Sequence, residues 1–424
     1  MSDTLLPLLL AVPTVVLACQ AGGRAARLLG QPPVIGEILA GILLGPSLLG
    51  WLAPGVQHHL LPPSALPTTS ALGSLGLLTF LFLIGLELDL RSLSATRGAV
   101  AAVSLSGVLL PMTLGAALAS AMYPHLAPPG VDRLPFTLFI AVALSITAFP
   151  VLARILADRG LETTPLGTFV LACAATDDAL AWCLLTAVVA LSTTGTALSA
   201  LTTLALTAVF AVGLTLLRPV LRTLLTRAGR TSDDLVLVLL FAGLCLSAYT
   251  TDEIGVHPAI GAFLFGAVAP RRLPAVERSA ARIRAVVLPL LLPLFFVDTG
   301  LHTDFSTLPA GQWGWGAALL AVAVIGKWGG TAGAARLAGG DWRWSAAVGT
   351  LMNCRGLTEL VVLGIGRQVG VITEELFTLL VIMTVVTTAA TAPVLKRVAG
   401  DDPRMAPPAP QDDPERDAVR EVTG

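Results

Sequence analysis

The chain has little charge and few aromatic residues. Only 12% of its 424 residues are Asp, Glu, Lys or Arg, 5% are aromatic and 55% are hydrophobic. A soluble protein of this size would carry charge on about a quarter of its residues, so this composition excludes a water-soluble globular protein. The five cysteines form neither a disulfide framework nor a CxxC metal spacing. No basic stretch precedes the first apolar segment, which argues against a cleaved signal peptide.

Apolar segments recur along almost the whole chain. A helix needs about 20 residues to cross about 30 Å of hydrocarbon. The segments that meet or approach this length are 4–26, 33–51, 71–89, 98–122, 135–156, 166–192, 198–221, 234–251, 257–270, 284–302, 314–338, 344–367 and 376–395. We therefore predict an all-α polytopic membrane protein with about 13 transmembrane helices. The polar residues 399–424 are predicted to form a short disordered cytoplasmic tail.

The basic residues fall in alternate gaps between these segments. Most Lys and Arg, from Arg24 and Arg27 to Lys396 and Arg397, lie in one set of gaps, whereas the opposite gaps hold only Arg133 and Arg367. Because basic residues concentrate on the cytoplasmic side, this pattern predicts that the N-terminus lies outside and the C-terminus inside. We expect the protein in the cell membrane.

The two halves of the chain resemble each other. Residues 33–41 and 258–266 share Pro, Ile, Gly, Leu and Gly in register, and residues 85–93 and 300–308 share Gly, Leu and Asp. The second predicted span thus matches the ninth, and this odd offset gives the copies opposite orientations. Inverted repeats of this kind are typical of secondary transporters. We predict a transmembrane domain over 1–398, with repeats at about 4–192 and 234–398 and a linker helix at about 198–221.

Two spans carry polar interruptions at corresponding places in this repeat. The fifth span reads Ser-Ile-Thr-Ala-Phe-Pro over 145–150, and the twelfth reads Asn-Cys-Arg-Gly-Leu-Thr-Glu over 353–359. Proline removes a backbone hydrogen bond, and freed backbone groups at membrane depth survive only beside protein or water. We predict two crossed broken helices, with a site near Ser145, Thr147, Pro150, Asn353 and Gly356.

The sixth span contains two adjacent carboxylates, Asp177 and Asp178. Each costs a few kcal/mol at the centre of a bilayer, on the order of 3. Adjacent helical residues point about 100° apart, so the two face different neighbours. Lys327, inside the eleventh span, needs a carboxylate partner, and we predict Asp177. Asp178 is then free to bind a proton or a monovalent cation, together with oxygens of Ser145 or Thr147.

At these residues the chain resembles the monovalent cation:proton antiporter-2 family, particularly the branch of plant cation/H⁺ exchangers. The resemblance runs from about residue 5 to residue 397, and its motifs are residues 33–49, 145–156, 290–301 and 351–360. It implies six-helix inverted repeats, a core domain with the broken helices, and a dimerisation domain. It also implies that Asp178 is the ion carboxylate and that Asp177 pairs with Lys327. In relatives an Asp-Asp pair often accompanies electrogenic exchange.

The predicted function is antiport of Na⁺ or K⁺ against H⁺, with both ions competing for Asp178 and with Asp177 and Thr147 as further ligands. Arg355 and Glu359 would compensate charge, while Glu37 and Asp298 suit structural and functional roles equally. We expect membrane lipid and a second copy of the chain as partners, a role in pH homeostasis, and neither a cofactor nor a nucleic acid.

Three alternatives remain open. A K⁺ channel would need a TVGYG-type filter, and none occurs in the sequence. An organic-anion symporter of the same plan is disfavoured by the buried carboxylates. An intramembrane aspartyl protease would need two Asp on different helices that share a proton, and no GxGD motif is present.

Overall fold

The computed structural model describes residues 2–87, 97–194, 197–303, 305 and 308–399. Within these ranges the chain is helical and contains no strand. The predicted tail over 400–424 and the polar residues 88–96 of the first repeat lie outside the described residues. The all-α prediction is confirmed.

The helices follow one another with short connections. In the first half they are α1 (Ser2–Leu28), α2 (Pro33–Leu44), η1 (Pro46–Gly50), α3 (Pro54–Leu60), α4 (Leu66–Glu87), α5 (Arg97–Leu126), α6 (Arg133–Ser145), α7 (Phe149–Asp158) and α8 (Pro165–Thr194). The linker is α9 (Ala197–Thr231). The second half contains α10 (Asp233–Glu253), α11 (Pro258–Val268), α12 (Pro274–Val286), η3 (Val287–Leu291), α13 (Leu292–Leu301), η4 (Ala310–Gln312), α14 (Trp313–Leu337), α15 (Trp342–Met352), α16 (Leu357–Gln368) and α17 (Glu374–Ala399).

Many of these helices are long and apolar enough to cross a membrane. Among the described residues there are 11 such stretches, and up to 12 if the bent pair of α15 and α16 is counted as one span. The ninth predicted segment is only the short apolar helix α11. The linker helix α9 extends ten residues beyond the predicted end at 221, because residues 222–231 contain no proline and their one glycine, Gly229, does not end the helix before Ser232 caps α10.

Glycines bring α2 of the first half against α13 of the second. A Cβ atom added at Gly41 would lie 2.4 Å from the carbonyl oxygen of Phe296, and one at Gly300 would lie 2.1 Å from the carbonyl carbon of Gly41. Only glycine permits two helix backbones to approach this closely, as in small-residue packing between membrane helices. The short helix α2 is therefore fixed on α13.

The same contact occurs between α11 of the second half and α4 of the first. A Cβ atom at Gly266 would lie 2.1 Å from the carbonyl oxygen of Phe82, and one at Gly85 would lie 2.1 Å from that of Phe263. In the sequence repeat Gly41 aligns with Gly266, and Gly85 aligns with Gly300. The repeat thus appears in three dimensions as two equivalent glycine crossings.

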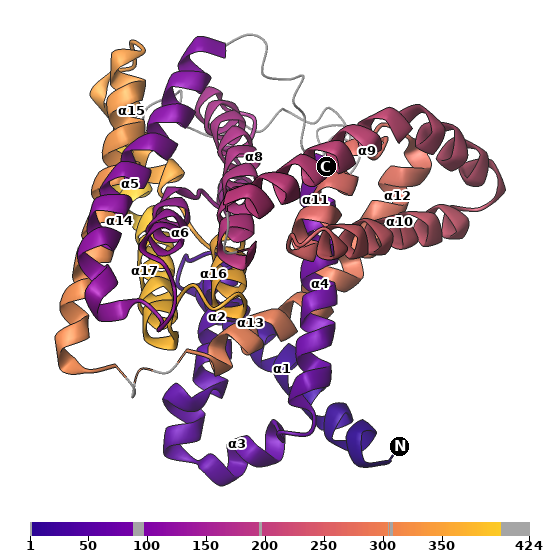
Figure 1. Cartoon of the computed structure of the whole chain (residues 1–424), viewed down its shortest axis with the longest axis horizontal. Coiled ribbons are helices and arrows are strands. Elements are labelled where there is room, and N and C mark those ends of the chain that lie inside the picture. The colour runs from indigo at the N-terminus through magenta and orange to yellow at the C-terminus, as the bar shows by residue number, and fades with distance from the viewer. Residues whose placement is uncertain (1, 88–96, 195–196, 304, 306–307, 400–424) are drawn as a thin grey trace, which may run out of the picture.

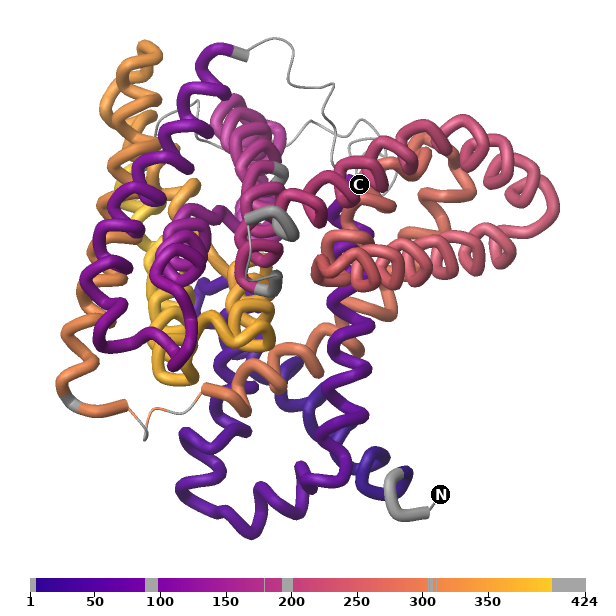
Figure 2. Tube along the Cα trace, in the orientation of Figure 1, coloured from indigo at the N-terminus to yellow at the C-terminus, as the bar shows by residue number. Residues whose placement is uncertain are grey.

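The helices form two groups. The scaffold bundle contains α1–α4 and α10–α13 (residues 2–87 and 233–301), and the site bundle contains α5–α8 and α14–α17 (residues 97–194 and 313–399). The linker α9 leads from one to the other (Figure 1), and Figure 2 shows the same separation along the Cα trace. Both predicted breaks in the helices and the adjacent pair Asp177 and Asp178 lie in the site bundle.

Candidate functional site

The site is built around two interrupted helices. In the first, α6 ends at Ser145, Ile146 is extended with φ −72° and ψ 140°, and α7 begins at Phe149 with Pro150 in its first turn. In the second, α15 ends at Met352 and α16 begins at Leu357, after Gly356 with φ +153° and ψ −126°. This backbone conformation is open only to glycine. Proline therefore marks one break and glycine produces the other.

The two breaks are in direct contact. The backbone N–H of Ala148 donates a hydrogen bond to the carbonyl of Cys354 over 3.0 Å, and the hydroxyl of Thr147 lies 3.1 Å from the carbonyl oxygen of Met352. These bonds satisfy backbone groups that neither helix can satisfy itself. The crossing of two broken helices that the sequence predicts is present. Hydrogen bonds between the two breaks stabilise it.

Asp177, Lys327 and Thr147 meet at this crossing. The Lys327 ammonium lies 2.8 Å from Asp177 Oδ2 and donates to the carbonyl of Ser145 over 2.5 Å, while Thr147 Oγ1 lies 3.1 Å from the same Asp177 oxygen. Asp177 and Lys327 are both 0% exposed. The structure thus places Lys327 with the partner that we predicted.

Asp178 is in a different environment from its neighbour. It is 1% exposed, and within the described residues neither of its carboxylate oxygens has a hydrogen-bond partner. The backbone N–H of Phe149, at the N-terminus of α7, lies near it, but this N–H donates to the carbonyl of Thr147 over 3.1 Å. A buried carboxylate without partners is costly as a bare anion. A bound proton or a bound cation would remove that cost.

Arg355 joins the two broken helices. Its guanidinium donates to the carbonyls of Ala143 and Leu144, at the end of α6, over 3.1 Å and 2.5 Å, and it pairs with Glu359 of α16 at 2.9 Å. Together with Lys327 it places two positive charges on the C-terminal carbonyls of α6, where the helix dipole favours cations. Thr388 of α17 bonds to both the N–H and the carbonyl of Arg355.

The remaining predicted site residues are near the crossing but do not contact Asp178. The hydroxyl of Ser145 donates to the carbonyl of Val142, and Thr147 contacts Asp177 rather than Asp178. Asn353 is 8% exposed and its Oδ1 has no partner among the described residues. The structure therefore brings Ser145 and Thr147 to the Asp177–Lys327 pair, because Ser145 is the last residue of α6, whose carbonyl Lys327 binds, and Thr147 lies two residues further on.

Two participants were missed in the sequence. A Cβ atom at Gly107 of α5 would lie 3.6 Å from Asp177 Oδ2, 3.8 Å from Lys327 Nζ and 2.6 Å from a methyl carbon of Thr331, so Gly107 makes room for the ion pair. Thr388, which holds Arg355, is the other. The small residues around Gly107 and the threonine-rich stretch of 384–391 were the available signals.

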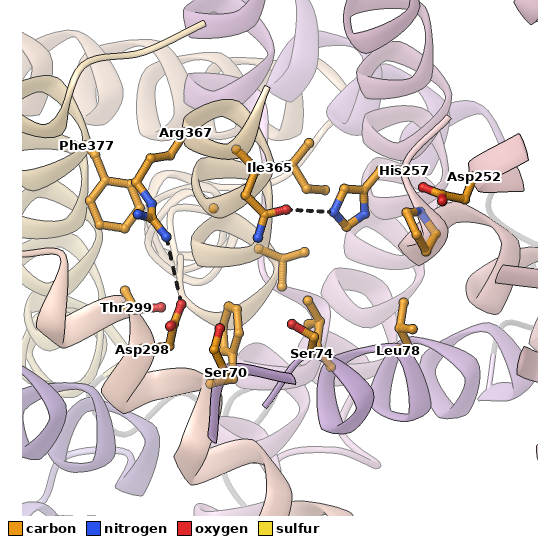
Figure 3. A pocket seen from close by; sticks show the side chains of 16 residues that line it. Ser70, Ser74, Leu78, Asp252, His257, Asp298, Thr299, Ile365, Arg367 and Phe377 are labelled. Atoms are coloured by element: carbon orange, nitrogen blue, oxygen red, sulfur yellow. Dashed lines mark hydrogen bonds and ion pairs between the residues drawn. The ribbon is translucent and has the colours of Figure 1, made fainter. Parts of the chain in front are cut away.

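A cavity of about 280 Å³ lies between the two bundles (Figure 3). It is lined by α4, α11, α13 and Asp252 of α10 in the scaffold bundle, and by α16 and α17 of the site bundle. Two interactions span it: Arg367 lies 3.8 Å from Asp298, and His257 Nε2 lies 3.3 Å from Gln368 Oε1. Val361, in the N-terminal half of α16, also lines the cavity. The cavity therefore extends along α16 toward the crossing, where this helix begins.

Crossed half-helices, buried carboxylates and an inverted repeat together define a secondary transporter. The transmembrane sodium/hydrogen exchanger family matches residues 14–397, and the chain belongs to this family.

Three similar proteins are named as antiporters. The Na(+)/H(+) antiporter NhaS4 of Synechocystis is 39% identical over 88% of this chain and 94% of its own length. Cation/H(+) antiporter 19 of Arabidopsis thaliana is 37% identical over 93% of this chain and 50% of its own. The K(+)/H(+) antiporter 1 of Saccharomyces cerevisiae is 32% identical over 92% and 46%. The chain thus spans about half the length of the plant and yeast relatives.

Solved structures show the same fold. The sodium proton antiporter MjNhaP1 from Methanocaldococcus jannaschii at pH 8 matches with a TM-score of 0.66 over 92% of this chain and 96% of its own, at 15% sequence identity. The family, the relatives and the fold support cation/proton antiport as the activity, and they favour a transporter over the protease alternative.

Proposed function

We propose that the chain exchanges a monovalent cation, Na⁺ or K⁺, for H⁺ by alternating access, and that both ions bind Asp178 in turn. One observation carries this proposal: both carboxylate oxygens of Asp178 are buried without a hydrogen-bond partner in the described structure, whereas Oδ2 of the neighbouring Asp177 is paired with Lys327. A proton or a cation removes the cost of the buried charge, and the two cannot occupy the carboxylate together. Competition for one group is sufficient for exchange.

The surrounding residues keep the site in order. Asp177 and Lys327 form an ion pair that compensates charge next to Asp178, and Thr147 orients Asp177. Arg355 links the end of α6 to Glu359 on α16, so that both broken helices move with the carboxylate. A Cβ atom at Gly356 would lie 2.7 Å from Val151 on α7, which keeps the crossing compact. Asp177 and Thr147 are the further cation ligands in this proposal.

A transport assay with matched variants tests the proposal. Purified protein in proteoliposomes with an imposed pH gradient is challenged with Na⁺, K⁺ and Li⁺, and the proton flux is measured. Asp178→Asn should reduce the cation-driven flux to that of protein-free vesicles. Asp234→Asn, the same substitution at an exposed position, should leave it unchanged. Undiminished flux in Asp178→Asn would refute the role of this carboxylate.

The orientation and the assembly are also proposals. The distribution of basic residues supports an outer N-terminus, an inner C-terminus and a place in the cell membrane, which puts the cavity beside Arg367 on the outer face. The exposed leucines of α1, such as Leu6 at 74% and Leu17 at 68%, suit contact with lipid or with a second copy in a homodimer. Native mass spectrometry with retained lipid would show a single-copy mass if the homodimer is wrong.

A further inference from the structure

Arg367 lies between two carboxylates that belong to different bundles. Its Nη1 donates to Glu374 of α17 over 3.4 Å, and its Nη2 lies 3.8 Å from Asp298 of α13. The first pair stays inside the site bundle, whereas the second connects the site bundle with the scaffold bundle across the cavity (Figure 3). Arg367 thus has one partner in its own bundle, Glu374, and one in the other bundle, Asp298.

The bond between the bundles is the looser of the two. At 3.8 Å the Arg367–Asp298 pair is longer than a hydrogen bond, and Arg367 Nε has no partner among the described residues. The guanidinium instead rests over the ring of Phe377, 5.6 Å from its centre. A side chain held in this way can transfer its charge from one carboxylate to the other without losing its main packing contact.

Asp298 itself is fixed and faces the cavity. It lies two residues before Gly300, whose backbone is in contact with Gly41 of α2, and its side chain is 24% exposed. Ser70, Ser74 and Thr299 line the same cavity with hydroxyl groups. His302 Nδ1 is 3.9 Å from the Asp298 carboxylate. A carboxylate among hydroxyls is a suitable first contact for a small hard cation.

Arg367 is also connected to the ion site. It lies at the C-terminal end of α16, a helix of 12 residues and therefore about 18 Å long. The other end of α16 carries Glu359, which pairs with Arg355 at the crossing. Release of Arg367 from Asp298 therefore removes one of the two interactions that tie this end of α16 to the scaffold bundle, and leaves the contact of Gln368 with His257.

We propose that Asp298 is the residue that first receives the cation, and that Arg367 is a switch that leaves Asp298 for Glu374 when the cation arrives. The empty cavity is then closed by the Arg367–Asp298 pair, and the cation itself releases the site bundle from the scaffold bundle on this side. This inference rests on the proposed antiport function and adds the residues that recruit the substrate.

Vesicles of the two orientations provide the test. Right-side-out and inverted membrane vesicles are prepared from a host without its own exchangers, and the half-saturating concentrations of Na⁺ and K⁺ are measured from each face. Asp298→Asn should raise this concentration about threefold from the cavity face, and Arg367→Gln should lower it about threefold, as expected for a partly exposed ion pair. Values from the opposite face should not change.

Two further variants separate a switch from a structural salt bridge. Glu374→Gln should raise the half-saturating concentration, because Arg367 then stays on Asp298, whereas Glu375→Gln on the same helix is the matched control and should have no effect. The double variant of Asp298→Asn and Arg367→Gln should behave like Asp298→Asn alone, because Arg367 then has no carboxylate to block.

The outcomes are distinguishable from a failure of the proposed function. Equal changes at both faces, additive effects in the double variant, or a reduced maximal rate at constant half-saturating concentration would overturn the switch, although antiport would persist. If the wild type shows no cation-dependent proton flux from either face, it is the antiport function that fails.

Discussion

The two halves of the site bundle have the same architecture but carry different charges. In the first half α8 contributes Asp177 and Asp178, whereas α17, the last helix of the second half, contributes threonines such as Thr388. The second half instead supplies the cations, Lys327 and Arg355, and both bind carbonyls at the end of α6. At the end of α15, the carbonyls of Met352 and Cys354 accept hydrogen bonds from the hydroxyl of Thr147 and the N–H of Ala148, which are uncharged. The two halves of the site bundle thus share an architecture but contribute different charges. As a result one carboxylate, Asp178, has no partner in the described structure.

The largest effect should follow from removing Lys327, the positively charged side chain at the end of α6. Lys327→Ala leaves Asp177 buried and unpaired, and we expect a loss of about 3–5 kcal/mol in stability. Thermal unfolding in detergent should show a large fall in the melting temperature. Lys396→Ala, at the exposed end of α17, is the control. Adding Asp177→Asn to Lys327→Ala should restore much of the loss, and no recovery would show that the charge pair is not its cause.

The two breaks should respond differently to loss of their special residue. Gly356→Ala places a Cβ at φ +153° and 2.7 Å from Val151, and we expect a cost of about 1–3 kcal/mol. Pro150→Ala should cost less than about 1 kcal/mol, because the bond from Ala148 to Cys354 still holds the break open. Melting temperatures of both variants measure this. Equal losses would contradict the distinction between the two breaks.

Thr388→Val tests whether the threonines of α17 hold the break between α15 and α16 in place. The hydroxyl accepts from the N–H of Arg355 over 3.1 Å and donates to its carbonyl over 2.7 Å. Its removal takes the acceptor from the N–H of Arg355 and leaves the carbonyl only the weak contact with the Cys354 thiol at 3.8 Å, at a cost of about 1–3 kcal/mol. Thr391→Val, whose hydroxyl bonds only within α17, should cost less. Denaturation midpoints compare the two, and equal effects would show that the Arg355 contact contributes nothing special.

The smallest effect should come from an ion pair outside the membrane. Hydrogen bonds from Arg278 lower the pKa of Asp233 below its ordinary value of 3.8. Its contribution to stability is therefore present above pH 3.8 and disappears as the pH falls through the lowered pKa. Asp233→Asn should reduce this acid sensitivity slightly, with no effect at pH 7 on transport. A profile of melting temperature against pH measures it, and an unchanged profile would show that the exposed pair is silent.

Several features of the fold could be read from the sequence because their causes are local. Apolar length predicts the spans, and the repeated Pro-x-Ile-Gly pattern predicts that α2 and α11 correspond. Pro150 and Gly356 predict the two breaks, because proline lacks a backbone N–H and glycine adopts backbone conformations that other residues avoid. The pairing of Asp177 with Lys327 could be predicted because two opposite charges at membrane depth need each other.

Other features could not be predicted, because they depend on segments far apart in the chain. Arg355 was predicted to balance Glu359, but its contact with the carbonyls of Ala143 and Leu144 spans more than 200 residues. Ser145 was expected to offer its hydroxyl to the ion, yet that hydroxyl bonds within α6. The ends of α9 and α11 also differ from the predicted ones, because apolar composition does not mark where a helix stops.

By itself the sequence determined the membrane class, the inverted repeat and the identity of the buried charged residues, since each follows from the cost of placing polar groups in hydrocarbon. Only the tertiary structure decided which charges are satisfied. The crossing gives Asp177 a lysine and a hydroxyl and gives Asp178 no partner among the described residues. The physical reason is that a partner at 3 Å is a property of packed helices, and adjacent residues on one helix face different neighbours.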